Sequence, residues 1–88
     1  MKRNRLEIIR DILKIVQTNN SIKQTPLLRK SNISSSKFKE YFLELLEKGF
    51  VIESKNKYQE KVISLTEKGF KFLEQYKTII NFIEEFNL

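Results

Sequence analysis

The chain has 88 residues, which suffices for one domain with a modest core, so burial in an oligomer would add to its stability. It contains neither cysteine nor histidine, and this excludes disulfides, thiolate metal sites, the commonest zinc ligand and the commonest general base. Together with the absence of a phosphate-binding glycine loop, this predicts a protein without catalysis, cofactor or metal.

Positive charge is concentrated in the first third of the chain. The net charge is +6, and residues 1–32 carry eight basic against two acidic side chains, whereas residues 66–88 carry three against four. This asymmetry favours a basic half that faces a polyanion and a C-terminal part that faces protein, although a solvated basic surface would also suit it. No apolar run approaches the roughly 20 residues that span a bilayer, so we expect a soluble, cytoplasmic protein with no membrane partner.

The first half of the chain predicts three helices. Apolar residues recur at helical spacing over residues 5–17, and polar residues 18–21 then form a turn. Thr25 is expected to cap a short helix that starts at Pro26 and ends near Ser31. A tight turn at residues 31–34 precedes a third helix, which is capped by Ser34 or Ser35 and runs to Lys48 before Gly49. Apolar stripes identify the buried faces, through Leu6, Ile9, Leu13 and Val16 in the first helix and Phe38, Phe42 and Leu45 in the third.

The second half predicts a β-hairpin and a long helix. Residues 50–53 and 58–65 are rich in β-branched and aromatic residues and flank a polar, basic tip, in which Asn56 is best suited to a left-handed conformation. Thr66 then caps a helix over residues 67–87, whose start Gly69 weakens slightly. The predicted fold class is therefore mainly α with a small β-hairpin (α+β). Its order of elements matches a winged helix-turn-helix domain over residues 1–65, followed by a C-terminal coiled-coil dimerisation helix over residues 66–88 in the same structural unit.

Candidate DNA contacts lie on the second helix, the third helix and the hairpin. In a helix-turn-helix the second helix of the pair enters the major groove, and a wing follows phosphates or the minor groove. Serine allows close approach, lysine reaches phosphate or guanine, and glutamate accepts from cytosine. The predicted contacts are Lys23, Thr25, Arg29, Lys30, Ser35, Ser36, Lys37, Lys39, Glu40, Lys55, Asn56, Lys57 and Lys61. A solvated helix face and a turn protected from aggregation by lysine remain alternatives. Lys2, Arg3 and Arg5 form either a basic arm toward DNA or a frayed start.

The last helix carries an apolar seam typical of a coiled coil. One register runs through Phe72, Tyr76, Ile79, Ile83 and Phe86, and a second runs through Leu73, Tyr76, Ile80 and Ile83. The alternative is that this helix packs back on the first one, but its apolar surface is broader than a solvated monomer tolerates. We therefore predict a homodimer. The predicted interface is Phe72, Leu73, Tyr76, Ile79, Ile80, Ile83 and Phe86.

Residues 25–34, the helix end at residues 45–52, and residues 65–69 with the long helix after them resemble the small archaeal winged helix-turn-helix DNA-binding proteins. That family includes chromatin-type proteins and plasmid and viral regulators, and the resemblance covers nearly the whole chain. It implies a homodimer joined by an antiparallel coiled coil of the last helices. The strings Leu-Glu-Lys-Gly and Leu-Thr-Glu-Lys-Gly also occur in multidrug-resistance-type winged-helix repressors, and Glu40 departs from a basic reading face.

The predicted function is non-catalytic binding of double-stranded DNA by a homodimer, as a transcriptional regulator or a nucleoid-associated protein. The alternative is a protein-interaction module. In that case the winged helix is a scaffold and the apolar terminal helix is the binding surface.

Overall fold

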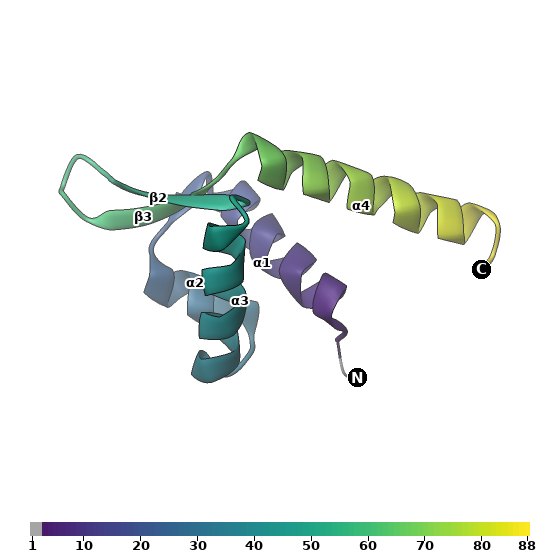
Figure 1. Cartoon of the computed structure of the whole chain (residues 1–88), viewed down its shortest axis with the longest axis horizontal. Coiled ribbons are helices and arrows are strands. Elements are labelled where there is room, and N and C mark those ends of the chain that lie inside the picture. Colours follow the sequence, from purple (N-terminus) through teal and green to yellow (C-terminus); the bar gives the residue numbers. More distant parts are fainter. Residues whose placement is uncertain (1–2) are drawn as a thin grey trace.

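A computed structural model describes residues 3–88 as a small body of helices and strands from which one long helix projects (Figure 1). Its elements are α1 (Arg5–Asn19), β1 (Ser21–Ile22), α2 (Gln24–Ser31), α3 (Ser35–Glu47), β2 (Val51–Lys55), β3 (Lys61–Leu65) and α4 (Glu67–Glu85). The predicted fold class is confirmed, because helices α1 to α3, the β2–β3 hairpin and the long α4 follow one another in the expected order. None of the helices in this part of the chain is long and apolar enough to cross a membrane.

The sheet has one strand more than the sequence predicted. Strand β3 lies in the middle of an antiparallel sheet of order β1-β3-β2. The additional strand β1 pairs Ser21 with Ser64 and Ile22 with Ile63. A strand of two residues leaves no alternation to detect, so its residues resembled the end of a turn. Asn20, which has a φ of 61°, turns the chain from α1 into this strand.

The tip of the hairpin differs from the prediction. The strands end at Lys55 and resume at Lys61, so residues 58–60 belong to the loop. Gln59, with a φ of 64°, adopts the left-handed conformation that was expected of Asn56. Asn56 instead stabilises the loop with its side chain, since its Oδ1 accepts hydrogen bonds from the backbone N–H of Tyr58 (2.9 Å) and of Glu60 (3.0 Å). Such side-chain-to-backbone bonds are a known alternative to a left-handed turn residue.

Helix α2 begins two residues earlier than predicted. Lys23 is its N-cap residue, so Thr25 is not the cap and Pro26 is the third helical residue. Proline is tolerated there because the first N–H groups of a helix have no intrahelical partner. Helix α3 begins as expected, with the Ser34 hydroxyl accepting from the Lys37 N–H at 3.3 Å. Gly49 follows α3 with a φ of 75°, as its predicted role in ending the helix requires.

One apolar core joins α1, α2, α3 and the sheet. Its fully buried side chains include Leu13 of α1, Leu27 of α2, Phe38 and Leu45 of α3, and Ile63 of β3. Within the predicted stripe of α1, Leu6 is the exception, because it lies in the first turn of the helix and remains exposed. The core therefore packs α2 and α3 against α1 and the sheet.

Helix α4 is packed on the body over its first half only. The ring of Phe72 meets that of Phe50 edge-on at 5.5 Å, and Leu73 also packs against the core. Beyond these residues the helix extends away from the body (Figure 1), and Ile79, Phe82 and Phe86 are 53–59% exposed. The alternative that the last helix packs back on the first is thus correct for its beginning and wrong for its end.

Candidate nucleic-acid interface

The predicted contact residues share one property in the structure, which is exposure. Twelve of the thirteen are exposed, and the exception is the half-buried loop residue Asn56. They lie on α2, on the first half of α3 and on the hairpin, which Figure 1 shows on the side of the body away from the end of α4. A nucleic acid could therefore reach this surface while α4 is engaged elsewhere.

Helix α3 presents small and basic side chains opposite its buried face. Phe38 and Phe42 stack in the core with ring centroids 5.5 Å apart, which fixes the rotation of the helix. The exposed residues of its first half are Ser35, Ser36, Lys37, Lys39 and Glu40. Glu40 lies 3.8 Å from the Lys37 ammonium group, whereas Lys39 makes no ion pair within residues 3–88. Glu40 thus offsets the charge of one lysine on this face and leaves the other free.

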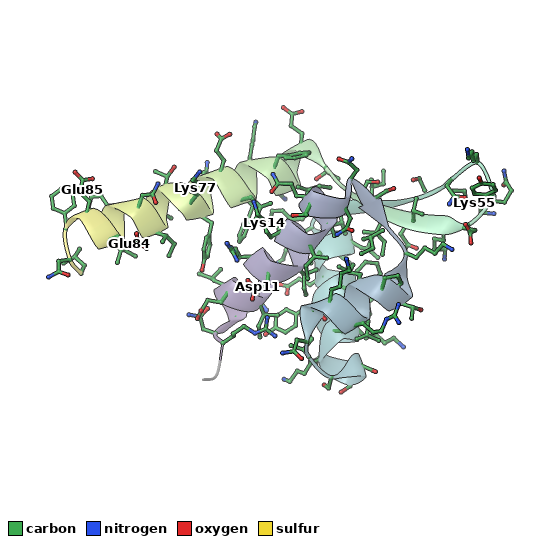
Figure 2. All side chains as sticks on the ribbon, turned by 180° about the vertical axis from the view of Figure 1, so that it is seen from behind. Asp11, Lys14, Lys55, Lys77, Glu84 and Glu85 are labelled. Atoms are coloured by element: carbon green, nitrogen blue, oxygen red, sulfur yellow. The ribbon has the colours of Figure 1, made fainter. Side chains whose placement is uncertain are left out.

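The hairpin places like charges side by side. Lys55 and Lys61 are direct partners across the two strands, an arrangement that costs stability unless counter-charge is present. Glu53 partly supplies it, at 3.4 Å from the Lys61 ammonium group. The ammonium group of Lys57 lies 5.1 Å from the centre of the Tyr58 ring. Figure 2 shows Lys55 at the opposite end of the molecule from Glu84 and Glu85.

Tyr58 is a residue of this surface that the sequence-based prediction missed. The prediction assigned it to a strand, but it lies in the loop at the hairpin tip and is 69% exposed. An exposed tyrosine between lysines suits contact with sugar and phosphate through its hydroxyl group. The signal that could have identified it is its position directly after the basic tip, Lys55 to Lys57.

Lys23 has an acidic partner from a distant part of the chain. Its ammonium group pairs with the Glu60 carboxylate, which joins the start of α2 to the base of the hairpin tip. The bond from Lys23 and a second one from Asn56 lower the pKa of Glu60 below its ordinary value. Lys23 therefore has a counter-charge within the single chain, unlike Lys39.

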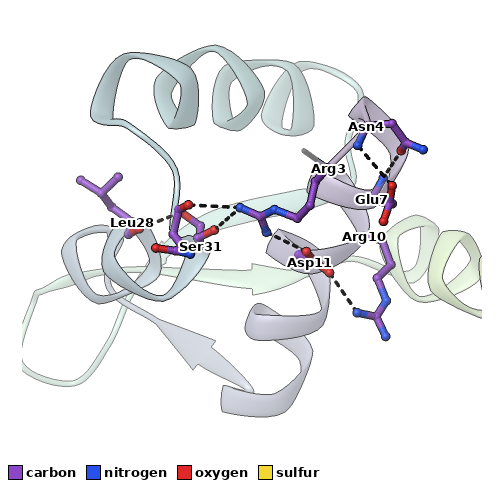
Figure 3. A network of polar contacts seen from close by, with 8 residues as sticks. Arg3, Asn4, Glu7, Arg10, Asp11, Leu28 and Ser31 are labelled. Atoms are coloured by element: carbon purple, nitrogen blue, oxygen red, sulfur yellow. Dashed lines mark hydrogen bonds and ion pairs between the residues drawn. The ribbon is translucent and has the colours of Figure 1, made fainter. Parts of the chain in front are cut away.

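Both arginines of the predicted N-terminal arm contact the body, and Figure 3 shows the contacts of Arg3. Arg3 pairs with Asp11 at 2.7 Å and donates to the backbone carbonyl oxygens of Ser31 (2.9 Å) and Asn32 (3.2 Å). Arg5 pairs with Glu44 across α1 and α3. These two arginines thus belong neither to a free arm nor to a frayed start, and Lys2 lies outside the described residues.

Comparison with known proteins agrees with this geometry. A winged helix-turn-helix family model matches residues 2–84. The structure of Sso10a-2, a DNA-binding protein from Sulfolobus solfataricus, is similar with a TM-score of 0.75 and 21% identity, over 97% of this chain and 86% of that one. SSV1 F-93 is similar with a TM-score of 0.71 and 29% identity, over 98% of this chain and 97% of that one.

A larger protein shares the fold as well. A MarR family transcriptional regulator from Silicibacter pomeroyi DSS has a TM-score of 0.76 at 18% identity, over 89% of this chain but only 53% of that one. A search of curated proteins finds no match. Because the family model spans α1 to nearly the end of α4, and the structure has the helix-turn-helix and the wing that define the family, the chain belongs to the winged helix-turn-helix proteins.

Proposed function

We propose that this chain binds double-stranded DNA without catalysis, as a homodimer, and acts as a transcriptional regulator or a nucleoid-associated protein of the cytoplasm. The observation that carries the proposal is the free positive charge on one side of the body. Within residues 3–88, no ion pair engages Arg29, Lys30, Lys39, Lys55 or Lys57. A surface that keeps several lysines and arginines uncompensated attracts a polyanion.

In this proposal α3 enters the major groove, which is about 12 Å wide and accepts one helix. Ser35, Ser36 and Lys39 would approach the base edges, because they project from the exposed first half of α3. Arg29 and Lys30 in the last turn of α2 would hold phosphates. Lys55, Lys57 and Tyr58 of the hairpin tip would follow the backbone on the other side of α3. Sso10a-2, of the same fold, is described as a DNA-binding protein.

The apolar surface of α4 that the body leaves uncovered supports the proposed dimer. Ile79, Phe82 and Phe86 are more than half exposed, and Ile83 is 36% exposed. Such a contiguous apolar stripe is expected to be covered by a partner. The half-buried seam residues Phe72, Leu73, Tyr76 and Ile80 connect this stripe to the body. A second copy is the simplest partner, because a two-fold dimer presents two α3 helices to one duplex.

The test of DNA binding is its dependence on salt. If each subunit of the dimer neutralises about three to five phosphates, the logarithm of the affinity falls against the logarithm of the salt concentration with a slope of about −5 to −9 for the dimer. Replacing Lys39, Lys55 and Lys57 by glutamine should make the slope less steep by about 0.9 for each phosphate that is no longer neutralised. Lys71→Gln, an equal change on exposed α4, is the matched control and should leave the slope unchanged. A flat salt dependence for the wild type would refute DNA binding.

The test of the dimer is the double substitution of Ile79 and Ile83 by lysine. Both side chains are exposed in the single chain, so the fold should survive while the dimer dissociates. Sedimentation equilibrium would show a monomer. A persistent dimer would move the interface to another surface.

The exposed end of α4 also supports the alternative of a protein-interaction module. In that case a triple lysine variant that still dimerises would keep its cellular effect. Loss of the cellular effect in that variant, with the dimer intact, favours DNA binding.

A further inference from the structure

An open hollow with basic walls lies where the end of α2 meets α1. Its volume of about 390 Å³ falls within the size range of small-molecule sites, about 300–1,000 Å³. In the described part of the chain, none of the residues that line it belongs to α3 or to the hairpin, and Lys30 is the only one among the predicted DNA contacts. The hollow is therefore largely separate from the candidate DNA surface.

The lining carries an excess of positive charge. Four of its side chains are cationic, namely Arg3, Arg10, Lys14 and Lys30, against the single carboxylate of Asp11. Both oxygens of that carboxylate are already occupied (Figure 3), because Oδ2 pairs with Arg3 at 2.7 Å and Oδ1 pairs with Arg10 at 2.9 Å. Asp11 thus holds the two arginines at the hollow and leaves the charge of the two lysines uncompensated.

Both lysines have only neutral hydrogen-bond partners. The Lys14 ammonium group donates to the side-chain oxygen of Gln17 at 3.1 Å. Lys30 reaches from α2 to α1, where its ammonium group donates to the side-chain oxygen of Asn19 at 3.5 Å. No ion pair within residues 3–88 involves either lysine. Cations from two helices therefore converge on the hollow without an anion of the chain to meet them.

The other lining residues show what kind of anion would fit. Among the described residues only one apolar side chain, the half-buried Ile15, lines the hollow, and Thr18, Asn19 and Asn32 add hydroxyl and amide groups. A hydrophilic ligand suits such walls better than an aromatic or aliphatic one. Guanidinium groups match the oxygens of a phosphate group in pairs, and ammonium groups add point charges from other directions.

We propose that this hollow binds a small molecule that carries a phosphate or pyrophosphate group. Arg10 and Lys14 would hold the group from α1, and Lys30 would hold it from α2. The phosphates of a DNA backbone have the same chemistry, but a duplex that lies on α3 and the hairpin would share only Lys30 with the hollow. The ligand is therefore a free phosphate compound, and the test below separates it from a duplex.

The test is a titration of the full chain with sodium pyrophosphate, followed by NMR of its amide groups in a phosphate-free buffer at constant ionic strength. The signals of Asn19 and Asn32 should shift and reach saturation. The double variant Arg10→Gln, Lys14→Gln should bind pyrophosphate about tenfold more weakly, since it removes two exposed cations. Both side chains are exposed, so the variant should keep its fold. No saturable shift at Asn19 and Asn32 in the wild type would overturn the inference.

The matched control is the double variant Lys39→Gln, Lys77→Gln, which loses the same charge. Lys39 belongs to the candidate DNA surface, and Lys77 lines a neighbouring groove between α1 and α4 together with Arg10 and Lys14. This control should bind pyrophosphate like the wild type. An equal loss in both double variants would mean that pyrophosphate follows the net charge of the chain and has no site in the hollow, which would overturn the inference.

A second measurement distinguishes the free compound from DNA. The variant Arg10→Gln, Lys14→Gln should leave the salt dependence of DNA affinity unchanged, because neither residue belongs to the proposed DNA contacts. A slope less steep than that of the wild type would place a duplex phosphate in the hollow and overturn the inference. A wild type that does not bind DNA would refute the proposed function, whereas the pyrophosphate titration would still decide this inference.

Discussion

Replacing Gly69 by alanine should destabilise the fold, although helix propensity alone predicts the opposite. Gly69 is the third residue of α4, where alanine is favoured over glycine by up to about 1 kcal/mol. However, a Cβ atom at Gly69 would overlap the carbonyl oxygen of Phe50 and lie 2.7 Å from Leu65 Cδ1. The Phe50 carbonyl cannot retreat freely, because it accepts a hydrogen bond from the Thr66 N–H at 3.1 Å. Overpacking of this kind costs about 1–3 kcal/mol or more.

We therefore expect a net loss of stability for Gly69→Ala, and each kcal/mol lowers the melting temperature of a domain of this size by about 4–8 °C. Urea and thermal unfolding followed by circular dichroism, at matched protein concentrations, measure the change. Thr78→Ala is the control, since this exposed site in the middle of α4 should gain a few tenths of a kcal/mol from propensity. If Gly69→Ala were as stable as the wild type or more so, the close contact between α4 and the hairpin would be refuted.

Three further predictions concern contacts that hold the elements together. Thr66→Ala should lower the free energy of unfolding, measured in urea, by about 1 kcal/mol, because it removes the side-chain cap of α4. Thr66→Ser keeps a hydroxyl group at this position and should retain most of the stability. Arg3→Met should lower the free energy of unfolding by about 1 kcal/mol, because it removes the hydrogen bonds to α2 and Asp11. Arg3→Lys should recover part of this free energy. Hydrogen bonds from Arg5 and then Lys48 lower the pKa of Glu44 in the folded chain. Its charged form therefore stabilises the fold above the ordinary carboxylate pKa, and this contribution disappears as the pH falls through the lowered value.

Each of these expectations has an outcome that contradicts it. Equal urea midpoints for Thr66→Ala and wild type would mean that the cap contributes nothing. An unchanged stability of Arg3→Met would mean that the hydrogen bonds of Arg3 to α2 and Asp11 contribute nothing to stability. Glu44→Gln should be less stable than the wild type near neutral pH and equal to it in acid, so a difference that persists in acid would point to a cause other than charge.

The helices and the caps of α3 and α4 were predictable because their signals are local. The residues of α3 that are buried recur every three or four positions, and Ser34, Gly49 and Thr66 mark helix ends through bonds to residues at most a few positions away. The surplus of lysines on the candidate DNA surface was visible for the same reason, since charge can be counted along the chain.

Contacts between distant segments could not be predicted. Strand β1 exists only because β3 offers it a partner more than 40 residues later, and Lys23 finds Glu60 only once the hairpin has folded. The need for glycine at position 69 likewise arises from Phe50 and Leu65, which belong to the hairpin. The pattern of α4 indicated that its apolar seam would be buried, but only the packing against the body decided which half remains exposed. Periodicity specifies the side of a helix that avoids water, whereas the neighbour that covers it is determined by tertiary packing.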